Sequence, residues 1–266
     1  EAGKNGEGSY LELFEENSET EKNLNFTPDM EECILFGDIV FVAIQTPHKK
    51  EFEGILPLTE NREDFEYKHL VKCIRDISFI LGRNNLTKTV SVISTVLPGT
   101  IRREIMPVMK NIHLCYNPYF IAMGTVIRDF LYPEFILLGS VNNDATNKVI
   151  EFYKTITDSP VYNTTLENAE MIKVSYNTFI GTKIALANNI MELCDKLPNT
   201  NSDDVMNGLF MATNRLISTN YLRGGMGDGG GCHPRDNIAL SWLSNKLDIS
   251  FNFFDAIMTC REKQTQ

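Results

Sequence analysis

The sequence predicts an α/β fold, with a parallel sheet in its first part and a long helix followed by an all-α region in its second. Continuous apolar runs at 38–44 and 88–93 have strand length and are typical of strands buried on both faces of a parallel sheet. The stretch 65–82 between them has helical spacing, which indicates βαβ units. From 167 to 197, apolar residues recur at three- and four-residue steps, which predicts one helix of about 45 Å.

The composition excludes several classes of protein. A chain of 266 residues that is 42% hydrophobic can bury one large core or two modest ones. Its net charge of −10 argues against binding to nucleic acid or to an anionic membrane. No run reaches the roughly 20 apolar residues that a membrane span needs. The six cysteines form no Cys-x-x-Cys pair, so we expect no metal site and no disulfide framework in a soluble, cytoplasmic protein.

The remaining elements follow in chain order. Asp64 is expected to cap the helix 65–82, and Asp236 to cap the helix that follows it. We place the sheet domain at 1–162 and the helical domain at 163–266, where the long helix is suited to pair two subunits in a homodimer. The other expected elements are helices at 10–16, from 28, 102–109, 144–156, 203–216, 237–247 and 251–261, and strands at 111–116 and 160–162.

A glycine-rich stretch before Cys232 is the clearest sign of a functional site. Six of the eight residues 224–231 are glycine, which lets a backbone take positive φ angles and approach a ligand closely. The thiol is expected beside a helix N-terminus and near Arg235, and both favour the thiolate. The pattern predicts a nucleophile, against the alternative of a flexible turn with a small buried cysteine.

Four motifs resemble those of the nucleotide-sugar dehydrogenases, of the UDP-glucose/GDP-mannose dehydrogenase type, and together they extend over nearly the whole chain. Residues 225–236 resemble the family's active-site signature, with Arg235 in place of its lysine. The others are Ser-Thr-Val-x-Pro-Gly-Thr at 94–100, Asn-Pro-x-Phe-x-x-x-Gly at 117–124 and Ala-Glu-x-x-Lys-x-x-x-Asn at 169–177.

The resemblance implies a Rossmann-like domain that binds NAD and a reaction that oxidises a nucleotide sugar, a UDP-sugar first, to its uronic acid. Cys232 would form a thiohemiacetal and then a thioester. Lys173, Asn177 and Asp236 would stabilise charge and orient water, and Thr95 would help to place that water. From the residues alone, Lys173 and Asn177 could equally be a solvated polar stripe, and Thr95 a helix cap.

The family's binding residues carry over to defined positions. For NAD they are Thr46, Pro47, Thr95 and Arg235. For the substrate they are Tyr119, Phe120, Ile121, Lys173, Asn177, Arg215, Tyr221, Gly225 and Gly229, with Arg215 reaching the substrate of the neighbouring subunit.

Two departures from the family leave other functions open. Tyr119 stands where the family has the glutamate of thioester hydrolysis, and a tyrosine with a pKa of about 10 is no carboxylate base. The alternatives are a two-electron dehydrogenase, or a catalytically silent paralogue or fragment that acts as a dimeric binding module. No Gly-x-Gly-x-x-Gly follows a strand, so we expect the start of the cofactor domain, and a further nucleotide-binding domain, to lie outside these residues.

Overall fold

The computed structural model describes residues 25–54, 61–122, 124–218, 220–225, 227–228 and 230–264. The chain divides into two compact units. The first takes the residues up to 46 and 67–171, and the second takes 47–66 and 172–266. The helix expected at 10–16 lies outside the described residues.

A five-stranded sheet forms the centre of the first unit. Its strands lie in the order of the sequence: β1 (Ile39–Val42), β2 (Lys88–Val92), β3 (Ile112–Tyr116), β4 (Ile136–Ser140) and β5 (Val161–Thr164). All neighbouring pairs are parallel except β3 and β4, which pair antiparallel through Cys115–Ser140 and Tyr116–Gly139. The predicted parallel sheet is therefore confirmed, with one antiparallel pair that the sequence analysis did not anticipate. The connection from β3 to β4 runs through the short helix α4 (Val126–Leu131) and returns the chain in the opposite direction.

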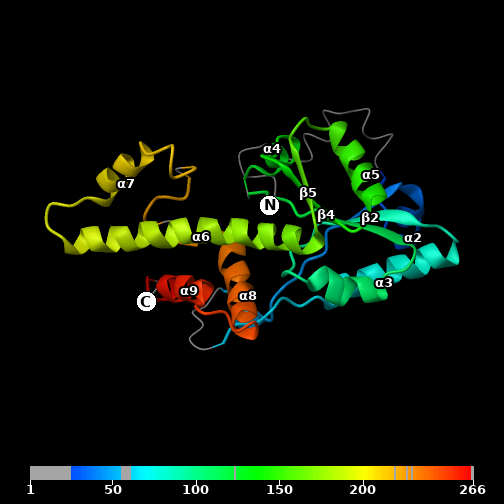
Figure 1. The fold of residues 1–266 in the computed structure, drawn as a ribbon, viewed down its shortest axis with the longest axis horizontal. Helices are drawn as coiled ribbons and strands as arrows, with labels where there is room; N and C mark the ends of the chain where they lie inside the picture. Colours follow the sequence, from blue (N-terminus) through cyan, green and yellow to red (C-terminus); the bar gives the residue numbers. More distant parts are fainter. Residues whose placement is uncertain are drawn as a thin grey trace. The chain divides into compact units, whose positions relative to one another are not determined.

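Helices cover both faces of this sheet, with α3 (Lys68–Arg83) and α5 (Asn143–Lys154) on opposite sides (Figure 1). Cys115 and Leu138 form one cluster with Val149 of α5. Because side chains alternate along a strand, the neighbouring strand residues face the other side, where α3 buries its apolar face. Both faces of the sheet are therefore covered, as its apolar strands require.

Several helix ends differ from the sequence-based expectation. Helix α2 (Met30–Phe36) begins after Asp29, whose carboxylate accepts from Glu31 N at 2.8 Å. Asp64, by contrast, does not cap α3, since it accepts from the adjacent Phe65 N and α3 starts only after Tyr67. The helix expected at 102–109 is a π-helical turn, η4 (Ile101–Ile105), followed by a 3₁₀ turn, η5 (Met106–Val108). It follows Thr100, so Thr95 is not its cap.

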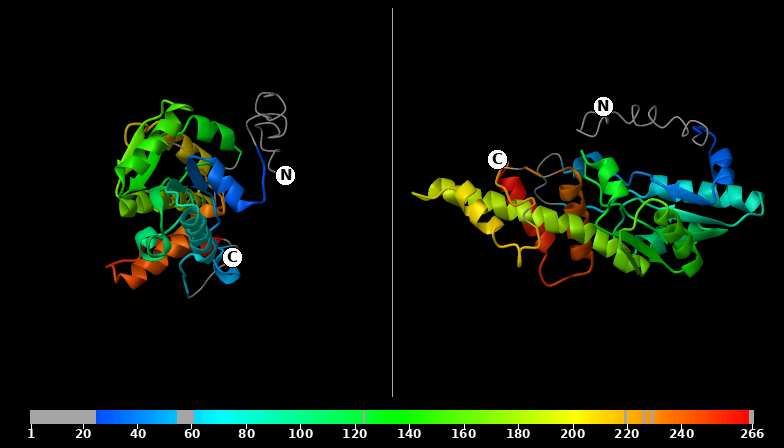
Figure 2. Two further views of the ribbon diagram at one scale, coloured as in Figure 1. Left: turned by 90° about the vertical axis from the view of Figure 1, so that its right-hand side faces the viewer. Right: turned by 90° about the horizontal axis from the view of Figure 1, so that it is seen from above.

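The second unit is helical. The predicted long helix is confirmed as α6 (Leu166–Lys196), which begins in the first unit and continues into the second. Within the second unit, α8 (Cys232–Lys246) and α9 (Phe253–Gln264) lie beside α6 (Figure 2). The short turn η3 (Lys50–Phe52) and α7 (Ser202–Phe210) complete it.

Two boundaries in this unit correct the prediction. Helix α7 ends at Phe210, six residues before the expected end, in the turns around 211–216. Helix α8 starts at Cys232, so Asp236 lies inside the helix and is not its N-cap. In the described parts of the chain, none of the helices has both the length and the apolar character to cross a membrane.

Glu170 fastens α6 to the turn after β2. Its side chain is fully buried and accepts from Gly99 N at 2.5 Å and from Ile101 N at 2.8 Å. Burial raises its pKa to about 7, although the two backbone donors work against that shift. One turn earlier on α6, Glu167 makes an exposed ion pair with Arg102.

We expect Glu170→Ala to lower the free energy of unfolding by about 2 kcal/mol, because it leaves two buried N–H groups without acceptors. The matched control, Glu167→Ala, removes only a surface pair and should cost about 0.5 kcal/mol. Urea unfolding of both variants measures the difference, and equal costs would contradict this account.

The stability of the unsubstituted protein should also depend on pH through Glu170. Its folded pKa of about 7 lies above the ordinary value of 4.5, so the unfolded chain releases this proton more readily. The stabilisation of the folded protein by the Glu170 carboxyl is therefore complete below pH 4.5 and is lost as the pH rises towards 7. The slope should be absent in Glu170→Ala.

Candidate active site

Cys232 is the first residue of α8, and its side chain is exposed. The thiol therefore lies at the positive end of a 15-residue helix, which favours the thiolate. Gly230, two residues earlier, has φ of +128°, a conformation that L side chains rarely adopt. This glycine lets the loop turn sharply into the helix, so the thiol lies at the N-terminal end of α8.

His233 follows Cys232 and changes the acidity of the thiol. Partial burial alone would raise the pKa of Cys232, but the hydrogen bond and charge of His233, with the charge of Lys173, lower it below the ordinary value. Burial alone would lower the pKa of His233, but its interactions with Cys232 and with the Asn177 carbonyl raise that pKa above the ordinary value. The two side chains thus favour a thiolate–imidazolium pair. Sequence analysis missed His233, although its place directly after the cysteine was a usable signal.

Helix α6 contributes Lys173 and Asn177, which lie one turn apart and are 8% and 6% exposed. They are therefore buried, which rules out a solvated polar stripe. Asn177 Nδ2 donates to Asp236 Oδ2 at 2.6 Å. Burial lowers the pKa of Lys173, while the charges of Asp236 and Cys232 oppose that shift.

Asp236 is fully buried one turn after the cysteine. Burial raises its pKa, whereas Arg235, Asn177 and Lys173 act to lower it. Its Oδ1 has no hydrogen-bond donor among the described residues, and the Arg235 Nε lies 3.9 Å away. One carboxylate oxygen thus holds Asn177, and the other can accept from a small polar group.

Arg235 is supported by the segment 47–66, which belongs to the same unit. Its guanidinium lies over the Phe65 ring, 5.3 Å from the centroid. His48 stacks against Phe65 at 4.7 Å and places its Nε2 3.0 Å from the Arg235 carbonyl oxygen. These contacts hold both the backbone and the side chain of Arg235.

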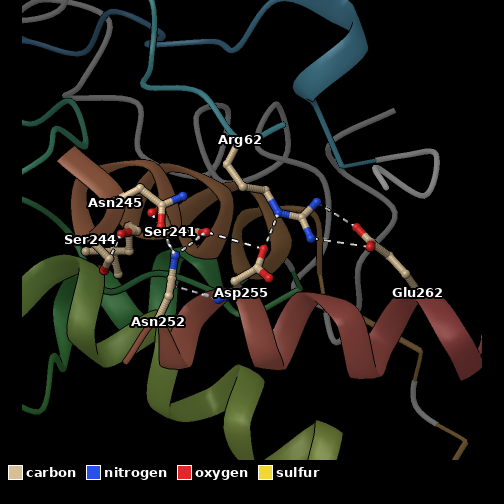
Figure 3. Close-up of polar contacts among 8 residues, drawn as sticks. Arg62, Ser241, Ser244, Asn245, Asn252, Asp255 and Glu262 are labelled. Atoms are coloured by element: carbon tan, nitrogen blue, oxygen red, sulfur yellow. Dashed lines mark hydrogen bonds and ion pairs between the residues drawn. The ribbon is translucent and has the colours of Figure 1, made fainter. Parts of the chain in front are cut away.

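Arg62 fastens the same segment to α9 (Figure 3). Its side chain is only 5% exposed, and its Nε lies 3.0 Å from Asp255 Oδ1. Its Nη1 lies 2.9 Å from Glu262 Oε1, which is also nearly buried. Asn252 adds a bond from Nδ2 to the Ser241 carbonyl at 3.1 Å, which ties the start of α9 to α8.

The glycine loop packs on α6. A side chain at Gly224 would come within 2.7 Å of Met191 Cβ, so only glycine fits there. Gly225 donates its N–H to Asn188 Oδ1 at 2.8 Å, so this group is already bonded within the protein rather than open to a ligand. Tyr221 has φ of +66° and places its ring edge-on to His233 at 6.1 Å. Gly229 lies outside the described residues.

A hollow of about 340 Å³ opens beside His233 in this unit. Asn188 and Arg261 line it, and Arg261 is paired with Asp228 at 2.5 Å. Arg215 is exposed in the turns after α7 and does not line this hollow.

Two of the residues expected at the cofactor, Thr46 and Thr95, belong to the first unit, and the other two, Pro47 and Arg235, to the second. Thr46 follows β1 and donates from Oγ1 to the Thr95 carbonyl at 2.6 Å, just after β2. The carboxyl ends of adjacent parallel strands are where ligands bind to open α/β sheets, so this edge fits a dinucleotide. Pro47 follows Thr46 in sequence and is grouped with the second unit.

Tyr119 is half-buried, and its ring lies 5.7 Å from that of Phe130. Burial raises its pKa above the ordinary value, although a hydrogen bond with Tyr153 lowers it in part. Tyr153 in turn donates to Asn117 Oδ1 at 2.6 Å. Tyr119 therefore stays protonated near neutral pH and cannot act as a base. Tyr119 and the adjacent Phe120 and Ile121 line an apolar pocket of about 300 Å³.

Comparison with known proteins identifies the family. Residues 7–157 match the sequence model of the UDP-glucose/GDP-mannose dehydrogenase family, NAD binding domain, and residues 167–263 match its central domain. The chain belongs to the UDP-glucose/GDP-mannose dehydrogenase family. Its sheet domain is therefore of the NAD-binding, Rossmann-like type, and its cofactor is NAD.

Individual relatives agree with this assignment. GDP-mannose 6-dehydrogenase of Pseudomonas aeruginosa is 27% identical over 252 residues, which cover 91% of this chain and 55% of the relative. UDP-glucose 6-dehydrogenase of Bacillus subtilis is 28% identical over 261 residues, which cover 97% of this chain and 53% of the relative. The structure of a UDP-glucose dehydrogenase from Pyrobaculum islandicum has the same fold, with a TM-score of 0.81 at 24% identity over 95% of this chain and 56% of the other. The chain thus spans about half the length of the relatives it matches.

We expect Arg62→Met to destabilise the second unit by about 3 kcal/mol, because it leaves the carboxylate of Glu262 buried without its partner. The control Lys72→Met removes an exposed pair with Asp76 and should change the unfolding free energy by less than about 1 kcal/mol. Thermal unfolding of both variants compares them, and a loss for Arg62→Met no larger than the control would refute the role of this pair.

Proposed function

We propose that this chain carries the catalytic centre of an NAD-dependent nucleotide-sugar 6-dehydrogenase, which oxidises its sugar to the uronic acid. The observation that supports this most is the group of buried polar side chains beside an exposed thiol at a helix N-terminus: Lys173, Asn177 and Asp236 next to Cys232. The named relatives act on UDP-glucose or GDP-mannose. We take a UDP-sugar as the first substrate to test.

In this proposal the chain's residues carry out the covalent chemistry. The Cys232 thiolate adds to the C6 aldehyde, and the ammonium of Lys173 and the amide of Asn177 stabilise the developing oxyanion. The unoccupied oxygen of Asp236 orients the water that later cleaves the thioester. Thr46, Pro47, Thr95 and Arg235 would hold NAD, which would supply one hydride acceptor for each of the two oxidation steps.

The remaining predicted contacts stay proposals for the nucleotide sugar. Tyr221 and Gly225 belong to the loop before α8, where Gly225 can offer its carbonyl because Asn188 holds its N–H, and Phe120 and Ile121 follow Tyr119 in the chain. The exposed guanidinium of Arg215 is free to reach the substrate of a second subunit. We propose the cytoplasm as the compartment, since a nucleophilic thiol stays reduced there.

Tyr119 favours a second candidate, a dehydrogenase that stops after two electrons. A protonated, half-buried tyrosine supplies no base for thioester hydrolysis. The third candidate is a catalytically silent paralogue that acts as a dimeric binding module.

Counting NADH per sugar separates these candidates. In the complete polypeptide, we expect two NADH per UDP-sugar and a loss of at least about 1,000-fold in kcat for Cys232→Ser, since the hydroxyl is a far weaker nucleophile. Cys260→Ser, a change at a half-buried thiol elsewhere in the unit, is the control and should keep both values. One NADH per sugar would indicate the two-electron enzyme. No NADH from any sugar in a panel of UDP- and GDP-sugars would indicate the silent paralogue.

We also propose that α6 pairs with α6 of a second copy. Phe179, Leu186 and Leu193 are 49%, 52% and 58% exposed at seven-residue spacing, so they form one apolar stripe along the helix. Such a stripe on a long helix is suited to burial against an identical partner.

Leu186→Lys should therefore weaken the dimer at least about tenfold, since it places a charge in the apolar stripe. Light scattering over a dilution series measures the dimer fraction. Met211→Lys, at an apolar residue 86% exposed and outside α6, should leave it unchanged. A protein that is monomeric before any substitution would sink the proposal.

A further inference from the structure

His233 has no assigned part in the proposed function, yet it is the side chain most closely joined to the nucleophile. It is 5% exposed, and its imidazole interacts with the thiol of the preceding residue, Cys232, so that the pKa of that thiol is lowered. Its Nδ1 lies 3.2 Å from the Asn177 carbonyl oxygen on α6, and the Tyr221 ring meets its imidazole edge-on. The ring is thus held from two sides, next in the chain to the residue that carries the reacting sulfur.

The contact with Asn177 decides which nitrogen can take a proton. A carbonyl oxygen only accepts, so His233 Nδ1 must carry a hydrogen. The neutral ring then has its lone pair on Nε2, which is the nitrogen that can take a proton. An imidazole oriented by a backbone carbonyl and bonded to a nucleophile is the arrangement of a general base.

The other charged groups around the site are less suited to this role. On α6, Lys173 is a cation with no acceptor, and on α8, Arg235 stays protonated. The fully buried carboxylate of Asp236 holds Asn177 with Oδ2, and in the proposed function its Oδ1 already has the part of orienting the water. Across the hollow, the carboxylate of Asp228 is engaged by Arg261.

We propose that His233 is a catalytic acid–base residue that takes the proton of the Cys232 thiol and later that of the water attacking the thioester. This role rests on the proposed function and supplies the base that Tyr119 cannot provide. It gives the role of the base to a residue on α8 rather than to the position after β3 where the family has its glutamate.

The two proton transfers balance as follows. When the thiol adds to the aldehyde, the C–S bond forms, the thiol proton moves to His233 Nε2, and the carbonyl electron pair moves to oxygen, which the imidazolium then protonates. In hydrolysis, the water oxygen bonds to the thioester carbon as His233 Nε2 takes one proton. The C–S bond then breaks, the acid is released, and the thiolate remains beside the imidazolium.

The rate of Cys232 alkylation by iodoacetamide against pH tests this role without NAD or sugar, with the labelled site identified by peptide mass spectrometry. In the unsubstituted protein, the thiolate should appear below the ordinary thiol pKa of 9.0. His233→Asn keeps an amide donor near the position of Nδ1 but has no group at Nε2. We expect its labelling to be roughly tenfold slower at pH 6.5, the loss that one pKa unit produces. His113→Asn, on β3, should label at the unsubstituted rate.

Several outcomes would overturn the role. The role is overturned if the alkylation rate of Cys232 in the unsubstituted protein follows pH like that of an ordinary thiol, and this outcome needs no variant. It is also overturned if folded His233→Asn has the same pH dependence of alkylation as the unsubstituted protein. If the enzyme turns over, intact mass should show His233→Asn trapped as the thioester on Cys232, and free enzyme at steady state would refute the hydrolytic part. A shifted labelling curve in a protein that forms no NADH would leave the Cys232–His233 pair standing while the proposed function fails.

Discussion

The crossing of α6 and α8 is the contact on which the candidate site depends. Asn177 reaches Asp236 through its side chain and His233 through its carbonyl, so one residue of α6 positions two of α8. The helices can approach this closely because a side chain at Gly181 would lie 3.0 Å from the Asn237 amide. A larger residue there would have to displace the Asn237 amide, which donates to the His233 carbonyl at 3.0 Å.

This crossing buries charges that a purely structural interface would avoid. Lys173 and Asp236 are almost inaccessible to solvent, and burial shifts the pKa of each towards its neutral form. Replacing such groups with apolar side chains often leaves a protein as stable or makes it more stable. Their presence beside an exposed thiol therefore indicates chemistry. The attraction of the Lys173 ammonium for the Cys232 thiolate and the Asp236 carboxylate opposes the pKa shifts that burial causes.

The periodic elements and the local motif could be predicted from the sequence, whereas the contacts between distant segments could not. Helix α6 and the strands 39–42 and 88–92 follow from periodicity, and the thiol at a helix N-terminus from the glycine loop. Asp236 was misjudged because an aspartate before an apolar run is typical of an N-cap, whereas Pro234 fits the first turn of a helix that has already begun. The support of Arg235 by His48 spans 187 residues and leaves no local signal.

The segment 47–66 also makes the second unit discontinuous in sequence. It leaves the sheet after β1, contributes His48, Arg62 and Phe65 to the helical unit, and returns to begin α3. A recombinant piece cut at the start of the second family match would therefore lack the arginine that clamps α9 and the rings that hold Arg235. During synthesis, these residues leave the ribosome long before α8 exists, so the second unit can fold completely only after nearly all of this chain has been made.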